Sequence, residues 1–359
     1  MKVFQFTPTV TPGDAVSNDA RAINRLVRSM GFEAELTADA IRGRYPGEGI
    51  SRLTRLPKLE QEDVFLYHHS IASSRLDWIR SLKCRKVMIY HNVTPPEFFL
   101  PYDINQVDLC RRGLQEMKDL KDSFDYCLAA SEFNKQDLLR AGYTCPIDVL
   151  PILIPFEDYR KEPDAATVQR CSDGWTNILF VGRIAPNKRQ ENVIRAFDCY
   201  KRTVNPKSRL ILVGSVSTAR YKEQLDEYVR VNRIEDVIFP GHIRFDEILG
   251  YYETASVFLC MSEHEGFCVP LLEAMSFDVP VIALDSCAVP YTLGGSGLLL
   301  PNASPTLAAA AIDRLVTDDK LRAAVIEGQR RRLQDFSYET VSAQFEALFR
   351  AFLEKRAAR

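Results

Sequence analysis

NILFVGRIAPNKRQENVIRAF, residues 177–197, contains the pattern that decides the fold. It begins as a short apolar run typical of a buried strand, passes through a loop, and continues with apolar residues at helical spacing. A strand that leads into a helix is one half of a βαβ unit, in which helices connect parallel strands. The stretch therefore predicts a parallel sheet covered by helices.

The same alternation extends along the chain in both directions. Short runs rich in β-branched and aromatic residues predict strands, and longer stretches with apolar residues three or four positions apart predict helices. The expected strands are 3–6, 64–69, 86–92, 126–131, 147–151, 177–183, 209–214, 237–241, 256–262 and 280–285. The expected helices are 15–30, 107–122, 190–204, 218–232, 245–252, 269–277, 305–316 and 337–355, with the last two closing the chain.

A polar segment separates two series of strands. Residues 154–175 contain two prolines and show little periodicity, so we place a linker there. The length of 359 residues corresponds to about two domains. The expected fold class is α/β, with two doubly wound, Rossmann-like domains that face a cleft. Their expected bounds are 1–155 for the N-terminal domain and 156–336 for the C-terminal domain.

The overall charge excludes one class of partner. The chain has 46 Lys and Arg against 48 Asp and Glu, a formal net charge of −2. Neither half is strongly basic, so we expect no nucleic-acid partner bound by bulk charge. Basic patches such as Arg330–Arg332 are modest and are interpreted as solvated faces.

The cysteines and the lack of long apolar runs indicate in which cellular compartment the protein is expected. The nine cysteines are scattered and form no Cys-x-x-Cys pair, which predicts reduced thiols and no zinc site. The first residues are too poor in apolar side chains for a signal peptide, and no run reaches the length of a membrane span. We therefore expect a cytoplasmic protein whose contact with a membrane, if it has one, is peripheral.

Several common catalytic motifs are absent from the sequence. It contains no Gly-x-x-x-x-Gly-Lys-Ser/Thr phosphate loop, no Gly-x-Gly-x-x-Gly after the first strand and no Gly-x-Ser-x-Gly elbow. The residues therefore give no direct support for a nucleoside triphosphatase, a dinucleotide oxidoreductase or a serine hydrolase of the α/β type.

The segment SEHEGFCVPLLEAM, residues 262–275, follows a buried strand and runs into a helix. Open parallel sheets bind ligands at this strand-to-helix edge. Glu265 would lie at the edge and Glu273 inside the helix, so one ligand can meet both carboxylates. An anion is favoured at the helix start, where the expected backbone donors are the amides of Phe267, Cys268 and Val269. The alternative is a helix with two solvated glutamates.

Two cations follow the strand of the opening segment. Arg183 leaves the strand end and Lys188 comes five residues later at the mouth of the helix. Arg offers a planar fork and Lys a point charge, so the pair suits a diphosphate. No metal is required, because these cations can offset the charge of the leaving group. The alternative is that both side chains are simply solvated.

Taken in order, the two segments resemble a known signature. Gly182-Arg183 with Lys188, followed some eighty residues later by Glu265-Gly266-Phe267 and Glu273-Ala274-Met275, is similar to the pattern of retaining, nucleotide-sugar-dependent glycosyltransferases of family 4. That family has the GT-B fold. The resemblance covers residues 177–285 closely and the N-terminal half more loosely, and it implies that helix 337–355 crosses back to the first domain.

The resemblance implies a role for each residue that matches. Arg183 and Lys188 would bind the donor diphosphate, Glu265 would contact the transferred sugar near the reacting centre, and Glu273 would hold the ribose. The family usually has Gly-Phe-Gly where this chain has Gly266-Phe267-Cys268, so a side chain stands where the loop usually has none.

The N-terminal half supplies two further matches. Gly13 and Asp14 lie between the first strand and the first helix, where family members keep a glycine-containing loop against the donor phosphates. YHNVTPPEFF, residues 90–99, resembles a His-Asn-(Ile/Val)-Thr-Pro segment of members that act on bacterial polysaccharides. The resemblance implies that His91 points into the cleft and bonds the donor sugar or phosphate. A histidine at a strand end is otherwise more often structural.

Other residues carry weaker predictions. His242 and Ile243 match the place where the family usually binds the nucleobase. His68 and His69 end a strand and can border the acceptor cleft, although a structural role is the commoner reading for such a pair.

The resemblance implies transfer with retention through an oxocarbenium-like state, with the donor phosphate as the base. The segment around His91 favours GDP-mannose or a related GDP-sugar over a UDP-sugar. The expected acceptor is a glycan or a lipid-linked precursor of a polysaccharide at the inner membrane face. No cofactor or resident metal is expected, and the oligomeric state stays open.

Two other classes of function compete with this prediction. A sugar-nucleotide epimerase or a phosphorylase can use the same fold, although no clear site exists for the cofactor lysine of a phosphorylase. A non-catalytic partner subunit is the other alternative. Retention of Arg183, Lys188, Glu265 and Glu273 speaks against a subunit that has lost catalysis.

Overall fold

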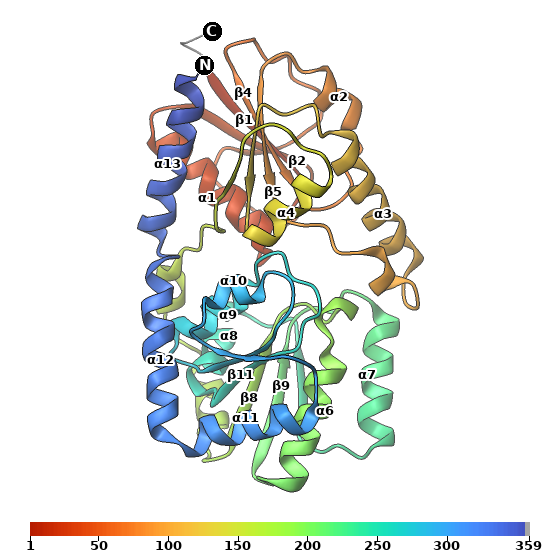
Figure 1. Cartoon of the computed structure of the whole chain (residues 1–359), viewed down its shortest axis with the longest axis vertical. Helices are drawn as coiled ribbons and strands as arrows, with labels where there is room; N and C mark the ends of the chain where they lie inside the picture. Colours follow the sequence, from red (N-terminus) through yellow and green to blue (C-terminus); the bar gives the residue numbers. More distant parts are fainter. Residues whose placement is uncertain (356–359) are drawn as a thin grey trace. The chain divides into compact units, whose positions relative to one another are not determined.

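The computed structural model describes residues 1–355, which fold into two compact units (Figure 1). Unit 1 comprises Met1–Glu97, Asn105–Pro155 and the chain from Asp335 onward. Unit 2 comprises Phe98–Ile104 and Phe156–Gln334. The main change of unit falls between Pro155 and Phe156, and a short piece of the first half, Phe98–Ile104, belongs to unit 2.

Unit 1 contains a seven-stranded parallel sheet with the order β3-β2-β1-β4-β5-β6-β7. The strands are β1 (Lys2–Val10), β2 (Glu33–Ile41), β3 (Ile50–Arg52), β4 (Val64–His69), β5 (Arg85–Tyr90), β6 (Tyr126–Ala129) and β7 (Ile147–Val149). The chain starts in the middle of the sheet at β1, builds outward to β3, and returns to the other side of β1 with β4. The order therefore reverses between β1 and β4, a doubly wound topology.

Helices connect the strands of unit 1 and cover its sheet. They are α1 (Ala15–Ser29), α2 (Leu76–Ser81), η1 (Pro96–Phe99), α3 (Ile104–Asp119), α4 (Glu132–Arg140) and α13 (Tyr338–Glu354), of which η1 and the start of α3 extend into unit 2. Ser131 caps α4 by accepting the backbone N–H of Asn134 at 3.2 Å. Such caps satisfy amide donors that a helix start leaves without a partner.

The core of unit 1 joins the two ends of the described chain. Apolar residues of α1, including Ile23 and Val27, pack with Phe345, Phe349 and Phe352 of α13 in one buried cluster. Figure 1 shows the first helix in red beside the last helix in blue. Each fully buried phenylalanine stabilises the fold by about 1.5–3 kcal/mol. The last helix is therefore part of the first unit's core.

Unit 2 contains a six-stranded parallel sheet with the order β10-β9-β8-β11-β12-β13. The strands are β8 (Thr176–Val181), β9 (Ser208–Val213), β10 (Val237–Gly241), β11 (Val257–Cys260), β12 (Val281–Leu284) and β13 (Leu298–Leu300). Here the order reverses between β8 and β11. The expected α/β class with two Rossmann-like sheets is confirmed.

Ten helical segments belong to the part of unit 2 that follows Pro155 in the described chain. They are η2 (Phe156–Arg160), α5 (Ala165–Cys171), η3 (Pro186–Lys188), α6 (Gln190–Thr203), α7 (Ala219–Val231), α8 (Phe245–Thr254), α9 (Val269–Ser276), α10 (Val289–Leu293), α11 (Pro305–Thr317) and α12 (Asp319–Gln334). The expectation that only two helices close the chain was wrong, because α12 lies between α11 and α13.

Two glycines allow the ends of β8 and β9 to approach each other. Gly182 and Gly214 both have a φ of 152°, and a Cβ on Gly214 would lie 1.9 Å from the Gly182 carbonyl oxygen. Only glycine fits at position 214, because any side chain would collide with that backbone. This close approach fixes the loop that carries Arg183.

Two further features of the described residues bear on the predictions. All nine cysteines are free thiols in the structure. Among the helices of residues 1–355, none combines the length and the apolar character that crossing a membrane requires.

Candidate active site

The predicted donor residues lie at the reversal point of the unit 2 sheet. β8 ends at Val181, shortly before Arg183, and β11 ends at Cys260, shortly before Glu265. Because β8 and β11 are parallel neighbours, the loops that follow them leave from the same edge of the sheet. Ligands of doubly wound sheets bind at this kind of edge.

Lys188 and Glu265 form a close ion pair. The Lys188 Nζ donates to Glu265 Oε1 and Oε2, each at 2.6 Å. The side chains are only 16% and 7% exposed, so water screens the pair weakly. Residues 77 positions apart in the sequence are thus brought into direct contact.

The carboxyl of Glu265 is held ionised. Burial alone raises its pKa, but the charge of Lys188 and hydrogen bonds from Lys188, Ser262 and Cys268 more than offset this effect. The net result is a pKa below the ordinary value of 4.5. Glu265 is therefore an anion at neutral pH although it is buried, which suits a group that must face developing positive charge.

The two loops that carry this pair are tied together by Asn187. Its Nδ2 donates to the backbone oxygen of His264 at 3.1 Å, and its own backbone oxygen accepts the N–H of Glu263 at 3.0 Å. The Gln190 side chain also donates to the Arg183 carbonyl oxygen at 2.9 Å. These contacts hold the loop that carries Lys188 against the loop that carries Glu265.

Arg183 lies exposed on the loop after β8. Its guanidinium makes no hydrogen bond or ion pair with another residue of the described chain. The structure thus places one neutralised cation, Lys188, and one unneutralised cation, Arg183, on the same strand-to-helix connection. A cation with no protein partner keeps its donors available for an anion from solution.

The start of α9 has an unusual residue at its cap. Cys268 precedes the helix in the left-handed conformation, with a φ of 74°, a conformation that glycine adopts most readily. Its buried Sγ lies within 4.8 Å of the ligand atoms of Cys260 and Glu265. Two thiols and a carboxylate can bind a metal, but this carboxylate is already neutralised by Lys188. Phe267 is buried just before the cap and Val269 is the first residue of the helix.

Glu273 lies one turn inside α9 and is bound by two phenols. The hydroxyls of Tyr159 and Tyr252 donate to its carboxylate at 2.5 and 2.6 Å. Burial raises the pKa of Glu273 in spite of these hydrogen bonds. Tyr159 comes from η2, so the segment after the linker contributes directly to the surroundings of this carboxylate. Neither tyrosine was predicted as a site residue.

The residues predicted to bind the nucleobase lie on the connection between β10 and α8. His242 is exposed and Ile243 is half-buried. Among the described residues, neither of them forms a hydrogen bond or an ion pair with Arg183, Lys188 or Glu265. Their role stays a prediction.

In unit 1, local structure explains why Gly13 and Asp14 occupy the loop after β1. Gly13 is exposed with a φ of 74°, where a glycine is favoured. Asp14 caps α1, since its carboxylate accepts the Ser17 backbone N–H at 3.0 Å and the Ser17 hydroxyl at 2.8 Å. The predicted contact of these residues with a diphosphate stays a prediction, and the structure accounts for Asp14 without it.

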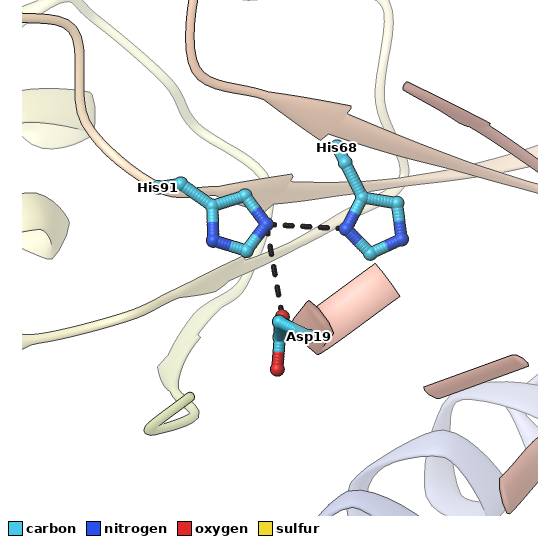
Figure 2. Close-up of side chains that lie close together, drawn as sticks. All are labelled: Asp19, His68 and His91. Atoms are coloured by element: carbon cyan, nitrogen blue, oxygen red, sulfur yellow. Dashed lines mark hydrogen bonds and ion pairs between the residues drawn. The ribbon is translucent and has the colours of Figure 1, made fainter. Parts of the chain in front are cut away.

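His91 belongs to a buried cluster with His68 and Asp19 (Figure 2). The three residues come from different places in the chain: Asp19 lies in α1, His68 lies in β4, and His91 directly follows β5. The Nε2 of His91 lies 3.1 Å from His68 Nδ1 and 3.7 Å from Asp19 Oδ2. The cluster forms at the reversal point of the unit 1 sheet, where β1 and β4 are neighbours.

Burial controls the charges in this cluster. It lowers the pKa of His91 to about 3 and the pKa of His68 well below 6.5. It raises the pKa of Asp19 to about 7, although the N–H of Leu153 donates to its Oδ1 at 2.8 Å. At neutral pH both imidazoles are therefore uncharged.

Sequence reasoning did not find Asp19. It lies in a helix with an ordinary amphipathic pattern, and a buried aspartate has no signature of its own. The parallel register of β4 with β5 pairs His68 with Ile89, which brings the ends of these strands together. Strand pairing was therefore the one signal that relates His68 to His91.

Comparison with known proteins finds a family model that matches most of unit 2. Residues 171–332 match a family model described as "Glycosyl transferases group 1". The chain is 26% identical over 295 residues to the O-antigen chain mannosyltransferase B of Escherichia coli, covering 74% of each protein. It is 31% identical over 197 residues to a D-inositol 3-phosphate glycosyltransferase of Kineococcus radiotolerans, covering 50% of this chain. That alignment spans 45% of the second relative, so the chain covers about half of it.

Solved structures extend the likeness to both units. A sucrose-phosphate synthase from Thermosynechococcus elongatus has a TM-score of 0.76 at 17% identity, covering 99% of this chain and all of that one. Anabaena HepE, solved in complex with UDP-glucose, has a TM-score of 0.74 at 15% identity, covering 98% of this chain and 100% of that one. At these identities the likeness concerns the fold, and it confirms the expected GT-B class.

Proposed function

Since residues 171–332 belong to the Glycosyl transferases group 1 family, we propose that the chain is a retaining hexosyltransferase. It moves a hexose from a nucleoside-diphosphate sugar to a glycan or a lipid-linked acceptor. The reaction contributes to polysaccharide synthesis in the cytoplasm, and a lipid-linked acceptor would bring the protein to the inner face of the membrane.

One observation carries the proposal: the buried pair of Lys188 and Glu265 beside the unpaired Arg183. The pair places a cation and an anion within 2.6 Å of each other at a ligand-binding sheet edge. A nucleotide sugar carries both complementary features, a doubly negative diphosphate and a sugar that becomes positive as its bond breaks. The arrangement suits such a donor better than it suits a purely anionic ligand.

Different residues bind the diphosphate and the sugar of the donor. Arg183 and Lys188 hold the diphosphate and offset the charge of the leaving group, assisted by backbone amides at Phe267, Cys268 and Val269. Their positive charge supplies what a divalent metal supplies in other enzymes, so no resident metal is needed. Lys188 then turns from Glu265 toward the phosphate, which leaves the carboxylate to stabilise the oxocarbenium-like sugar.

The remaining predicted residues position the rest of the donor. Glu273 accepts the ribose hydroxyls in place of, or together with, the Tyr159 and Tyr252 hydroxyls. His242 and Ile243 contact the nucleobase, and Gly13 and Asp14 contact the phosphates. His91 forms a hydrogen bond with the donor sugar or its phosphate, and the donor phosphate acts as the base for the acceptor hydroxyl.

We favour GDP-mannose as the donor. The support is the similarity to an O-antigen chain mannosyltransferase and to a GDP-mannose-dependent mannosyltransferase of Mycobacterium tuberculosis, 24% identical over 249 residues. A UDP-sugar is the competing donor, because Anabaena HepE was solved with UDP-glucose. The names of the O-antigen and capsular polysaccharide relatives support a growing glycan as acceptor.

The first experiment identifies the donor. Unfolding is followed thermally with a panel of GDP- and UDP-sugars, and the true donor at a hundredfold over its Kd stabilises the protein by about 2.7 kcal/mol. Release of the nucleoside diphosphate is then measured with and without extracts that contain glycan acceptors. Release that needs the acceptor supports transfer, whereas epimerised sugar or acceptor-independent release contradicts it.

The second experiment tests the residues. Arg183→Ala and Glu265→Ala should each lower kcat/KM about 10²- to 10³-fold, the usual effect of removing one electrostatic contact to the transition state. Arg220→Ala is the matched control, since Arg220 is an exposed arginine of α7. Near-normal rates in both site variants overturn the assignment, and a folded protein is verified by its circular dichroism.

A further inference from the structure

The Nδ1 atom of His91 has no hydrogen-bond partner within the described chain, although it is buried. The side chain of His91 is only 1% exposed. A buried polar atom is nearly always paired, so an unpaired one in a candidate site needs an explanation. Whether this atom is a donor or an acceptor depends on where the single ring proton lies.

The position of that proton follows from a chain of hydrogen bonds that starts at a backbone carbonyl. The carbonyl oxygen of Glu48 can only accept, so the Asn24 side chain presents its Nδ2, which donates at 2.7 Å. The Oδ1 of Asn24 must then face the other way, where it accepts from Gln5 Nε2 at 3.1 Å. The amides of both Asn24 and Gln5 are thereby oriented.

The orientation of Gln5 decides the proton of His68. Gln5 Oε1 lies 3.0 Å from His68 Nε2 and can only accept, so Nε2 carries the proton. Burial keeps His68 neutral by lowering its pKa. Its Nδ1 is therefore a bare lone pair.

The lone pair of His68 decides the proton of His91 in turn. His68 Nδ1 lies 3.1 Å from His91 Nε2, which must donate to it (Figure 2). Asp19 Oδ2 lies 3.7 Å from the same Nε2, and in its ionised form Asp19 favours a proton there as well. Since His91 is also neutral, its Nδ1 is left as an unprotonated acceptor.

We propose that Asn24, Gln5 and His68 form a tautomer relay, which holds His91 with its proton on Nε2 so that Nδ1 accepts a hydrogen bond from a substrate hydroxyl. His91 is the residue that touches the substrate, and the three relay residues are positioning residues. The catalytic part of the inference rests on the proposed function, whereas the position of the proton does not.

The relay selects between two ligand groups. A phosphate oxygen is an acceptor and gains nothing from a bare lone pair, whereas a hydroxyl donates to it. His91 therefore contacts a hydroxyl of the sugar rather than the diphosphate. A donor analogue that lacks this hydroxyl leaves Nδ1 unpaired in the complex and should react about 100-fold more slowly.

A bound metal is the competing explanation of the cluster. Ligand atoms of Asp19, His68 and His91 lie within 4.8 Å of one another. A metal would need the lone pair of His91 Nε2, which moves the proton to Nδ1. Metal-bound imidazoles nearly always donate their other N–H to an acceptor, and none of the described residues offers one to Nδ1. The proton on Nε2 fits the surroundings better.

Nuclear magnetic resonance of the ¹⁵N-labelled full chain tests the proposal directly. The chain has five histidines, so the ring nitrogens can be assigned by substitution. We expect His91 to show a protonated Nε2 and an unprotonated Nδ1 at neutral pH, unchanged by added Zn²⁺. A protonated Nδ1, or a shift of both His68 and His91 rings on adding Zn²⁺, overturns the proposal.

Substitution of the relay gives the second test. Gln5→Met removes the acceptor of His68, so His91 should show both tautomers and kcat/KM should fall about 100-fold. Thr37→Val is the matched control: it removes the buried hydroxyl that donates to the Gln5 backbone oxygen at 3.0 Å but leaves the relay intact. An unchanged tautomer in a folded Gln5→Met protein contradicts the relay.

The experiments distinguish a failure of the proposed function from a failure of the inference about His91. If the expected tautomer is found but no nucleotide sugar supports transfer, the proposed function fails and the proton assignment stands. If transfer is found but the deoxy analogue reacts as fast as the donor for every sugar hydroxyl tested, the hydroxyl contact fails. The wild-type spectrum decides the assignment even if Gln5→Met does not fold.

Discussion

Glu265 and Asp19 are both buried carboxylates, but only Glu265 faces a cation. Lys188 lies 2.6 Å from Glu265, whereas Asp19 has a backbone N–H and two neutral imidazoles around it. The pKa is therefore lowered for Glu265 and raised for Asp19. The two residues make opposite predictions for the dependence of stability on pH.

Glu265→Gln removes an anion from a buried ion pair and leaves Lys188 without its partner. The expected cost is about 3 kcal/mol of unfolding free energy at pH 7, the low end for a broken buried pair. Because the folded-state pKa of Glu265 lies below its ordinary value of 4.5, this stabilisation is present above pH 4.5. It is lost as the pH falls through the folded-state pKa.

Urea denaturation at several pH values measures this difference. The gap between wild type and Glu265→Gln should narrow below pH 4.5. A gap that stays constant down to pH 3 would mean that the charge of Glu265 contributes nothing.

Wild type should lose stability at high pH as the buried Asp19 ionises, and the Asp19→Asn variant should not show this loss. The folded-state pKa of about 7 exceeds the ordinary 3.8, so the stabilising effect of the protonated form is complete below pH 3.8 and disappears as the pH rises through 7. The shift corresponds to at most about 4 kcal/mol. Asparagine keeps the oxygen that accepts from Leu153 but does not titrate.

Urea midpoints at pH 5 and pH 8 measure this effect. Wild type should lose more stability than Asp19→Asn between these values. Glu116, whose pKa burial also raises to about 7, titrates in both proteins and cancels in the comparison. Parallel pH profiles for the two proteins would contradict the raised pKa.

At the scale of elements, α1 depends on its cap. Asp14→Ala removes the acceptor for the Ser17 N–H and should cost about 1 kcal/mol of unfolding free energy. Asp14→Asn keeps an acceptor and should cost only a few tenths. If Asp14 serves the helix alone, neither change alters the KM for the donor, and a large KM effect of Asp14→Asn would instead show a contact with the ligand.

The packing of α13 is a second property of an element. Phe349 is buried against Phe32, Phe345 and Phe352, so Phe349→Ala should cost about 3–5 kcal/mol. Arg350→Ala, at the exposed neighbouring position, should stay within about 0.5 kcal/mol of wild type. Equal midpoints for the two variants in urea would show that α13 does not belong to the core.

The elements also show where sequence patterns succeed and fail. β8 and α6 were predicted to within a few residues, because an apolar run followed by helical spacing leaves little choice. α12 was missed, since its buried contacts include a glutamine rather than an apolar stripe. Gln329 accepts the Val281 N–H at 2.9 Å and donates to the Val279 oxygen at 2.8 Å. A hydropathy pattern has no signal for such a side chain.

The candidate site also contains residues that a sequence pattern indicates and residues that it does not. Lys188 and Glu265 could be singled out because each follows a predicted strand at a recognisable spacing. The structure brings their side chains into contact, and their roles with a ligand stay predictions. Gln5 and Asp19 were not found, because their meaning depends on partners from other elements. Tertiary contacts also account for Phe98–Ile104: its rings pack on unit 2, with Tyr102 lying 5.2 Å from the ring of Tyr221.

At the scale of the whole molecule, a net charge near zero conceals strong local differences. The formal charge of −2 is a sum over 46 basic and 48 acidic groups, and some of these form short-range pairs on the surface, such as Lys222 with Asp226 and Arg230 with Glu227. Exposed pairs contribute little to stability. The charges that matter for the proposed reaction are Arg183, which has no such partner among the described residues, and the pair of Lys188 and Glu265, which is shielded from water.

The helix α13 belongs to the core of unit 1 but is synthesised after unit 2. Unit 1 uses residues on both sides of unit 2 in the sequence, so all of unit 2 is synthesised before α13. Until then the apolar face of α1 that will contact Phe345 and Phe349 has no cover. A nascent chain with such a face is prone to aggregation and is a substrate for chaperones. Unit 1 therefore cannot complete its core until unit 2 has been translated.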